Sequence, residues 1–138
     1  MLDAKNKSPL AKIRMVIRLE RFIMTAITKD ADALFCVMYK AYLEKTKDKV
    51  PRSEALVVGG MFDIQNNLAP TLSLEDVREL CEELESAGYL VLVGKCDGGF
   101  GMARIAPGGV IRMENRFKNG MNDVLDFLGK IKGVIPFI

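Results

Sequence analysis

Residues 72–105 read LSLEDVRELCEELESAGYLVLVGKCDGGFGMARI, and the expected fold follows from this stretch. Ser73 precedes Glu75 and Asp76, which is typical of a helix start, because a side-chain oxygen and negative charge both suit the free backbone amides there. Gly88 tolerates the positive φ at which helices commonly end. Between them, apolar residues recur at the spacing of one buried helix face: Val77, Leu80, Cys81 and Leu84. The pattern therefore predicts a helix over residues 73–88.

Two short strands are predicted after this helix, joined by a glycine-rich turn. Residues 89–93 and 102–105 are mostly large or β-branched apolar residues. The turn between them contains Gly94, Gly98, Gly99 and Gly101. A helix followed by a β-hairpin is the second half of a winged helix-turn-helix. We therefore expect a mainly α fold with a small β-hairpin, extended by extra N- and C-terminal helices.

The composition predicts a soluble domain without catalytic machinery. The chain has 138 residues, 49% hydrophobic and 28% charged, enough for one domain with a core. No run reaches the roughly 18 apolar residues of a membrane helix, and no signal-peptide pattern opens the sequence. Three cysteines without paired spacing suit a reducing compartment, so we expect a cytoplasmic protein with no membrane partner. Without histidine, and with no acid, base and nucleophile set, we expect no enzyme, cofactor, metal site or small-molecule substrate.

Three regions are predicted: an N-terminal helical extension (1–29), a winged-helix core (30–105), and C-terminal helices with an apolar tail (106–138). Ser8-Pro9 predicts the start of a helix that reaches about Ile27. Ala106-Pro107 predicts another, followed by a last helix over residues 121–132.

Within the core, two further helices are expected before residue 72. The first starts near residues 30–32, ends in the lysine-rich residues 45–49, and has an apolar face of Leu34, Val37, Met38, Ala41 and Tyr42. Val50-Pro51 would then stop it and form a short extended piece pairing with the hairpin. The next helix is expected over residues 53–66, although Gly59-Gly60 lies in its middle.

Several motifs resemble small bacterial and phage winged-helix proteins of the YjcQ type. Residues 105–115, IAPGGVIRMEN, resemble their strand-to-helix joint, which commonly reads I-T-x-K-G-x-x-Y-L-E-E-N. Residues 128–136, LGKIKGVIP, are similar to their L-K-x-I-K-x-x-I-P ending, and residues 83–90, ELESAGYL, to L-x-x-E-G-Y-I. The chain departs at Arg112, where the family often has an aromatic residue, and has a longer segment between its second and fourth helices.

Residues 34–105 also resemble the winged-helix tails of replication-initiator ATPases. Both resemblances imply the same fold, and the first implies a bacterial or phage setting. Neither implies a reaction.

Charge is unevenly distributed along the chain. Residues 1–29 carry seven Lys/Arg against two Asp/Glu, whereas the helix over 73–88 carries six Asp/Glu against Arg78 alone. In a DNA-reading winged helix, this helix would enter the major groove, where closely spaced phosphates would repel its carboxylates.

Two functions therefore remain open. The first is a DNA-binding protein, such as a transcription regulator, that contacts duplex DNA weakly or nonspecifically. The candidate contacts are Lys45, Lys47, Lys49, Arg52, Arg78, Lys95 and Arg104. The second is a winged helix that binds another protein and does not read DNA. Phe100 in the hairpin turn either anchors such a partner or folds back on the sheet.

The terminal helices predict a homodimer. Their apolar residues exceed what a small core can cover, and pairing across a two-fold axis is the commonest way to bury such a surplus. The candidate interface residues are Leu10, Ile13, Ile17, Val124, Leu128 and Ile131.

Overall fold

The computed structural model describes residues 26–133 as a helical domain with a small antiparallel sheet. The helices are α3 (Lys29–Lys47), α4 (Arg52–Ala55), α5 (Met61–Asn67), α6 (Leu74–Ser86), α7 (Pro107–Arg116) and α8 (Met121–Ile131). The strands are β1 (Val57–Gly59), β2 (Leu90–Val93) and β3 (Met102–Ile105). The helix expected over residues 8–27 lies almost entirely outside the described residues, and the apolar tail, residues 134–138, lies entirely outside them.

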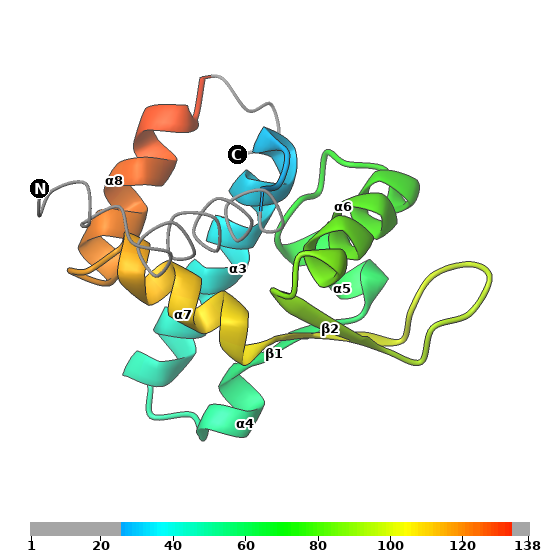
Figure 1. Ribbon diagram of the computed structural model, residues 1–138, viewed down its shortest axis with the longest axis horizontal. Coiled ribbons are helices and arrows are strands. Elements are labelled where there is room, and N and C mark those ends of the chain that lie inside the picture. The colour runs from blue at the N-terminus through cyan, green and yellow to red at the C-terminus, as the bar shows by residue number, and fades with distance from the viewer. Residues whose placement is uncertain (1–25, 134–138) are drawn as a thin grey trace, which may run out of the picture.

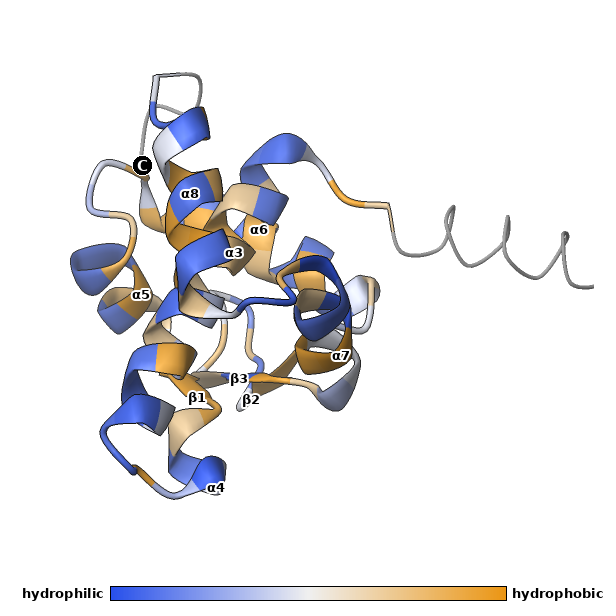
Figure 2. Ribbon diagram, turned by 90° about the vertical axis from the view of Figure 1, so that its left-hand side faces the viewer, coloured by the Kyte–Doolittle hydropathy of each residue, from blue (hydrophilic) through white to orange (hydrophobic). Residues whose placement is uncertain are grey.

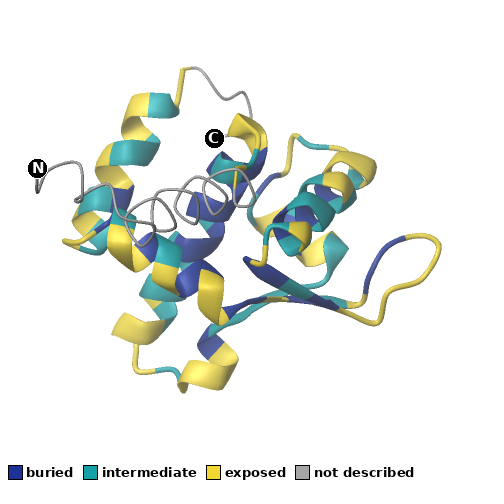
Figure 3. Ribbon diagram, viewed as in Figure 1, coloured by how far each residue is buried: buried dark blue, intermediate teal, exposed yellow. Residues whose placement is uncertain are grey.

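Helix α3 is the central element of the domain. It contacts α6, α7, α8 and β1, and Figure 1 shows it between α7 and α8 on one side and α5 and α6 on the other. Leu34, Phe35 and Met38 on α3 are essentially inaccessible to solvent. Hydrophobic residues gather where α3, α6 and α8 meet (Figure 2), and buried positions follow the length of α3 and the inner face of the sheet (Figure 3).

The ends of α3 and α6 follow the expected capping chemistry. The Thr28 hydroxyl accepts a hydrogen bond from the Ala31 amide at 3.3 Å, so α3 begins slightly before the predicted break at residues 30–32. Ser73 caps α6 by accepting from the Asp76 amide at 3.1 Å. Gly88 has φ 87° directly after α6, as its position in the sequence predicted.

The single helix expected over residues 53–66 is wrong. The structure divides this segment into α4, β1 and α5. Gly59 has φ 122°, which a helix cannot contain, and Gly60 is extended at the start of α5. The Gly60 amide donates to the Asp63 carboxylate at 3.1 Å, which fixes the first turn of the new helix.

The expected two-stranded hairpin is therefore part of a three-stranded sheet. Its strand order is β1-β3-β2, with both pairs antiparallel. Val57 lies opposite Arg104, so β1, rather than the expected piece at residues 50–51, pairs with the hairpin. The pairing continues past β1, because the Ile105 amide donates to the Leu56 carbonyl at 2.9 Å.

The C-terminal helices complete the core. Pro107 occupies the first turn of α7, where its missing amide hydrogen leaves no broken bond. Val110, Met113 and Phe117 face inward, and Val124 of α8 is fully buried. No helix in the described part of the chain is long and apolar enough to cross a membrane.

Candidate functional site

The cations predicted to contact DNA fall into separate groups. Arg78 lies on α6 and Lys95 follows β2, whereas Lys45, Lys47, Lys49 and Arg52 lie at the end of α3 and the start of α4. Figure 1 shows α4 well away from the long loop between β2 and β3. Arg104 is exposed on the central strand β3.

Arg78 is held by carboxylates of its own helix. Its guanidinium donates to Glu75 at 2.8 Å and to Glu82 at 3.5 Å. The hydrogen bond to Glu75, helped by the negative charge of Glu82, raises the pKa of Arg78. The only cation of α6 is therefore already paired on both sides.

Lys95, in the loop after β2, is also paired with a carboxylate of α6. Its ammonium lies 2.8 Å from Glu85, which also accepts a hydrogen bond from the Leu92 amide at 3.2 Å. The Lys95 hydrogen bond holds the pKa of Glu85 below its usual 4.5. The loop that would reach DNA phosphates thus directs its cation back to α6.

Lys45 is a structural residue, whereas other cations of the second group are open. The Lys45 ammonium donates to the Val57 carbonyl at 2.7 Å and connects α3 to β1. Within residues 26–133, no ion-pair partner is present for Lys47, Lys49, Arg52 or Arg104, and all four are exposed.

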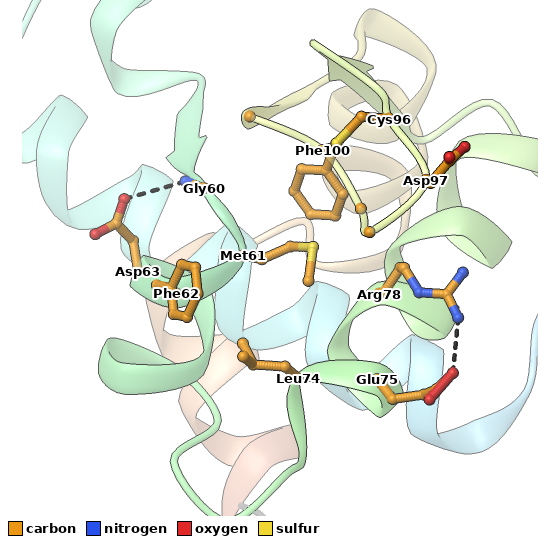
Figure 4. Close-up of a pocket in the computed structure, with 13 residues that line it drawn as sticks. Gly60, Met61, Phe62, Asp63, Leu74, Glu75, Arg78, Cys96, Asp97 and Phe100 are labelled. Carbon is orange, nitrogen blue, oxygen red and sulfur yellow. Dashed lines mark hydrogen bonds and ion pairs between the residues drawn. The ribbon is translucent and has the colours of Figure 1, made fainter.

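A concavity of the described surface lies between α5, α6 and the loop after β2. We call it the hairpin cleft; its volume is about 920 Å³. Figure 4 shows Met61 between Phe100 and Leu74, with Arg78, Glu75 and Asp97 along one side. The lining residues are Gly60, Met61, Phe62, Asp63, Leu74, Glu75, Arg78, Cys96, Asp97, Gly98, Gly99, Phe100 and Gly101.

Close backbone approach shapes the hairpin cleft. A Cβ on Gly99 would lie 1.9 Å from the Met61 sulfur, and one on Gly60 would lie 2.8 Å from the Gly101 carbonyl oxygen. The loop therefore rests directly on the start of α5. Phe100 is only 7% exposed, so it folds back on the domain. Phe62, by contrast, is 66% exposed beside the cleft.

The apolar residues of the cleft were not among the sequence-predicted site residues. Met61, Phe62 and Leu74 belong to no recognisable sequence motif. Met61 and Phe62 were also expected inside a long helix. The Gly59-Gly60 pair was the available signal, since two adjacent glycines mark a place where backbones can approach closely.

A second charged cluster joins α3 to α7. Arg116 donates to Asp32 at 2.6 Å, and Arg112 lies 3.8 Å from the same carboxylate oxygen. Arg112 also donates to the Tyr89 hydroxyl at 2.9 Å and lies 4.9 Å from the centre of that ring. Arg116 stacks on Phe127 of α8 at 4.4 Å. These contacts connect elements of the core, so we assign the cluster to stability.

The candidate dimer residues of α8 are partly used within the single chain. Val124 is fully buried, so its side chain is not available to a partner. Leu128 and Ile131 are partly buried against the same core. Leu125, which is 46% exposed, is the large apolar residue of α8 that faces outward. Leu10, Ile13 and Ile17 lie outside the described residues, and the homodimer stays a prediction.

No protein-family model, curated protein or solved structure matches this chain. The resemblance to YjcQ-type proteins therefore also stays a prediction.

Proposed function

We propose that the domain is a winged helix in which α6 occupies the position of the recognition helix. The order α3, β1, α5, α6, β2, β3 supports this assignment. So does the strand order β1-β3-β2, in which the last strand lies between the other two. The loop between β2 and β3 then corresponds to the wing.

We infer further that this winged helix is a protein-interaction module and does not read DNA. The observation that carries the inference is the pairing of Arg78 with Glu75 and of Lys95 with Glu85. To contact phosphate, either cation would first have to leave a carboxylate at 2.8 Å. The released carboxylates would then face a backbone carrying one charge about every 1.7 Å.

The hairpin cleft suits a protein partner instead. Exposed and half-exposed apolar side chains, Phe62, Met61 and Leu74, lie beside the carboxylates of Asp63, Glu75 and Asp97. Apolar anchors surrounded by charges are the usual arrangement of a protein-binding site. The partner that complements this cleft is a segment with apolar anchors and basic flanks.

A defined probe tests this function. Binding of a fluorescent amphipathic helix built from leucine and lysine is measured by anisotropy, beside binding of a mixed-sequence DNA duplex. We expect the peptide to bind and Phe62→Ser to weaken it at least about tenfold, as for a central apolar anchor. Leu125→Ser, a similar change on α8, is the control. Tight, sequence-specific duplex binding that disappears in Arg78→Ala would overturn the proposal.

Weak DNA contact is a second candidate function, favoured by the four exposed cations Lys47, Lys49, Arg52 and Arg104. Such binding would be nonspecific and would weaken steeply with salt, because phosphate contacts release counterions. Replacing the four residues by glutamine should abolish it, whereas Arg78→Gln should not change it. A salt-independent affinity would contradict this candidate.

A further inference from the structure

The described chain begins against α6. The Thr28 amide and hydroxyl donate to the two carboxylate oxygens of Glu83, at 2.6 and 2.9 Å. Thr28, close to the start of the described residues, is therefore held on the most acidic helix of the domain.

The composition of residues 8–25 complements the hairpin cleft. The segment carries Lys12, Arg14, Arg18 and Arg21 against Glu20. Its apolar residues include Leu10, Ile13, Val16, Ile17, Phe22, Ile23 and Met24. The cleft presents the opposite charge around apolar side chains, and Asp76 and Glu79 extend the exposed acidic surface along α6.

The attachment point lies on a different side of α6 from Leu74 and Arg78, two of the cleft-lining residues of this helix. Leu74 lines the cleft, and Glu83 follows it by nine positions on the same helix. At about 100° per residue, Glu83 lies about 180° around the helix axis from Leu74 and about 140° from Arg78, whereas the cleft-lining Glu75 is about 80° away. To reach its own cleft, a segment leaving at Glu83 would have to pass around α6. A segment from another molecule would meet no such obstacle.

We propose that residues 8–25 of a second copy occupy the hairpin cleft, reciprocally in a two-fold dimer. The inference rests on the proposed function of the cleft and names its partner. Phe62 and Met61 receive the apolar residues of the segment, while Glu75 and Asp97 face its arginines. The remaining apolar residues of the two segments pack against each other near the axis, since isologous contacts bring equivalent surfaces together.

Sedimentation equilibrium at micromolar concentration tests the dimer. The full chain should be a dimer, and a chain lacking residues 1–25 should be a monomer. Phe62→Ser should raise the dimer dissociation constant at least tenfold, and Leu125→Ser should leave it unchanged. A monomeric full chain would overturn the inference. So would a dimer that persists without residues 1–25.

Reversing the charges tests whether residues 8–25 bind the cleft and whether they bind the cleft of the other copy. Variant one carries Arg18→Glu and Arg21→Glu; variant two carries Glu75→Arg and Asp97→Arg. Each alone should be monomeric, because like charges then meet in both halves of its dimer. An equimolar mixture should form a heterodimer, because both halves regain opposite charges. Formation of that heterodimer also shows that both variants are folded.

The outcomes separate this inference from the proposed function. If the mixture stays monomeric while the leucine-lysine peptide still binds in a Phe62-dependent manner, the cleft is a protein site but its partner is not residues 8–25. If neither interaction depends on Phe62, both proposals fail. If residues 8–25 protect Cys96 from alkylation in a monomeric chain, the segment occupies its own cleft. That result would overturn the proposed exchange of segments between two copies.

Discussion

Gly109 occupies a position in α7 where no side chain fits. A Cβ there would lie 2.6 Å from both the Phe35 ring and the Tyr89 carbonyl oxygen. Glycine within a helix usually weakens it by about 1 kcal/mol relative to alanine, but here the close packing of α7 requires it. Gly129 in α8 provides the contrast, because nothing lies within 4 Å of its added Cβ.

We predict opposite effects for the same substitution at these two glycines. Gly109→Ala should lower the free energy of unfolding by about 1–3 kcal/mol through overpacking. Gly129→Ala should raise it by up to about 1 kcal/mol through helix propensity. Urea denaturation of both variants measures the difference. Equal effects would show that α7 does not pack this closely on α3.

Asp32 is the single carboxylate between two arginines. Its side chain is 19% exposed and lies 2.6 Å from Arg116. Asp32→Asn should destabilise the fold by about 1–3 kcal/mol, because a charge-assisted hydrogen bond is lost. The Arg116 guanidinium keeps its position beside the aromatic rings but no longer faces a carboxylate. Asp126→Asn, an exposed carboxylate on α8, should change stability by less than about 0.5 kcal/mol. Chemical denaturation at neutral pH compares the two.

Sequence spacing predicts some of these residue contacts and not others. Glu75 and Glu82 flank Arg78 at helix spacings of three and four, so their pairing was available from the sequence. The pairing of Asp32 with Arg116 was not available, because 84 positions separate them and only the packed fold brings them together.

At the scale of elements, the loop after β2 is shaped by where it touches α5. Gly99 has φ 144°, and its backbone lies against the Met61 side chain. Gly98 is adjacent, but nothing lies within 4 Å of its added Cβ. The two glycines therefore have different structural roles, although they are adjacent in the sequence.

Alanine substitutions at Gly98 and Gly99 should have different effects on stability and binding. Gly99→Ala should destabilise the domain by more than about 1 kcal/mol, since it combines a backbone strain with a clash against Met61. It should also weaken peptide binding, because the cleft loses its shape. Gly98→Ala should leave thermal stability and binding close to wild type. A tolerant Gly99 would show that the loop does not rest on α5.

The sequence predicted most elements of the fold and misassigned one segment. Helix α6 carries strong local signals, since a cap, an amphipathic period and a glycine stop agree. Strand β3 is marked by apolar residues that follow a glycine-rich turn. Strand β1 has only three residues, too few for a period, and its pairing partner is on β3. Its conformation is set by a distant strand, which local patterns cannot reveal. The cleft was missed for the same reason, because it depends on where β1 ends and α5 begins.

For the molecule as a whole, two buried thiols make stability sensitive to alkaline pH. Burial raises the pKa of Cys36 and of Cys81 from 9.0 to about 12. Below pH 9 both thiols are protonated in the folded and unfolded states. Between pH 9 and 12 only the unfolded chain releases these protons, so the unfolded state is favoured and stability falls as pH rises.

The expected slope is about 1.4 kcal/mol per pH unit for each thiol in that interval. Urea midpoints at several pH values measure it, and Cys81→Ala should flatten the profile relative to wild type. Cys96 is exposed, so Cys96→Ser should not change the slope. Ellman's reagent provides an independent check in a chain that lacks residues 1–25, whose cleft is open: Cys96 should react in the folded state, and Cys36 and Cys81 only after denaturation. An identical pH profile for Cys81→Ala would contradict the prediction.

The strand order β1-β3-β2 also has a consequence for how the chain folds during its synthesis. Val57 pairs with Arg104, which is made 47 residues later, and β1 and β2 do not pair with each other. At about 5–20 residues per second, a ribosome needs roughly 2–10 s to cover that interval. A nascent chain that ends before Met102 therefore contains two strands and no sheet. The four residues of β3 complete both pairings together, so this sheet assembles in one late step rather than strand by strand.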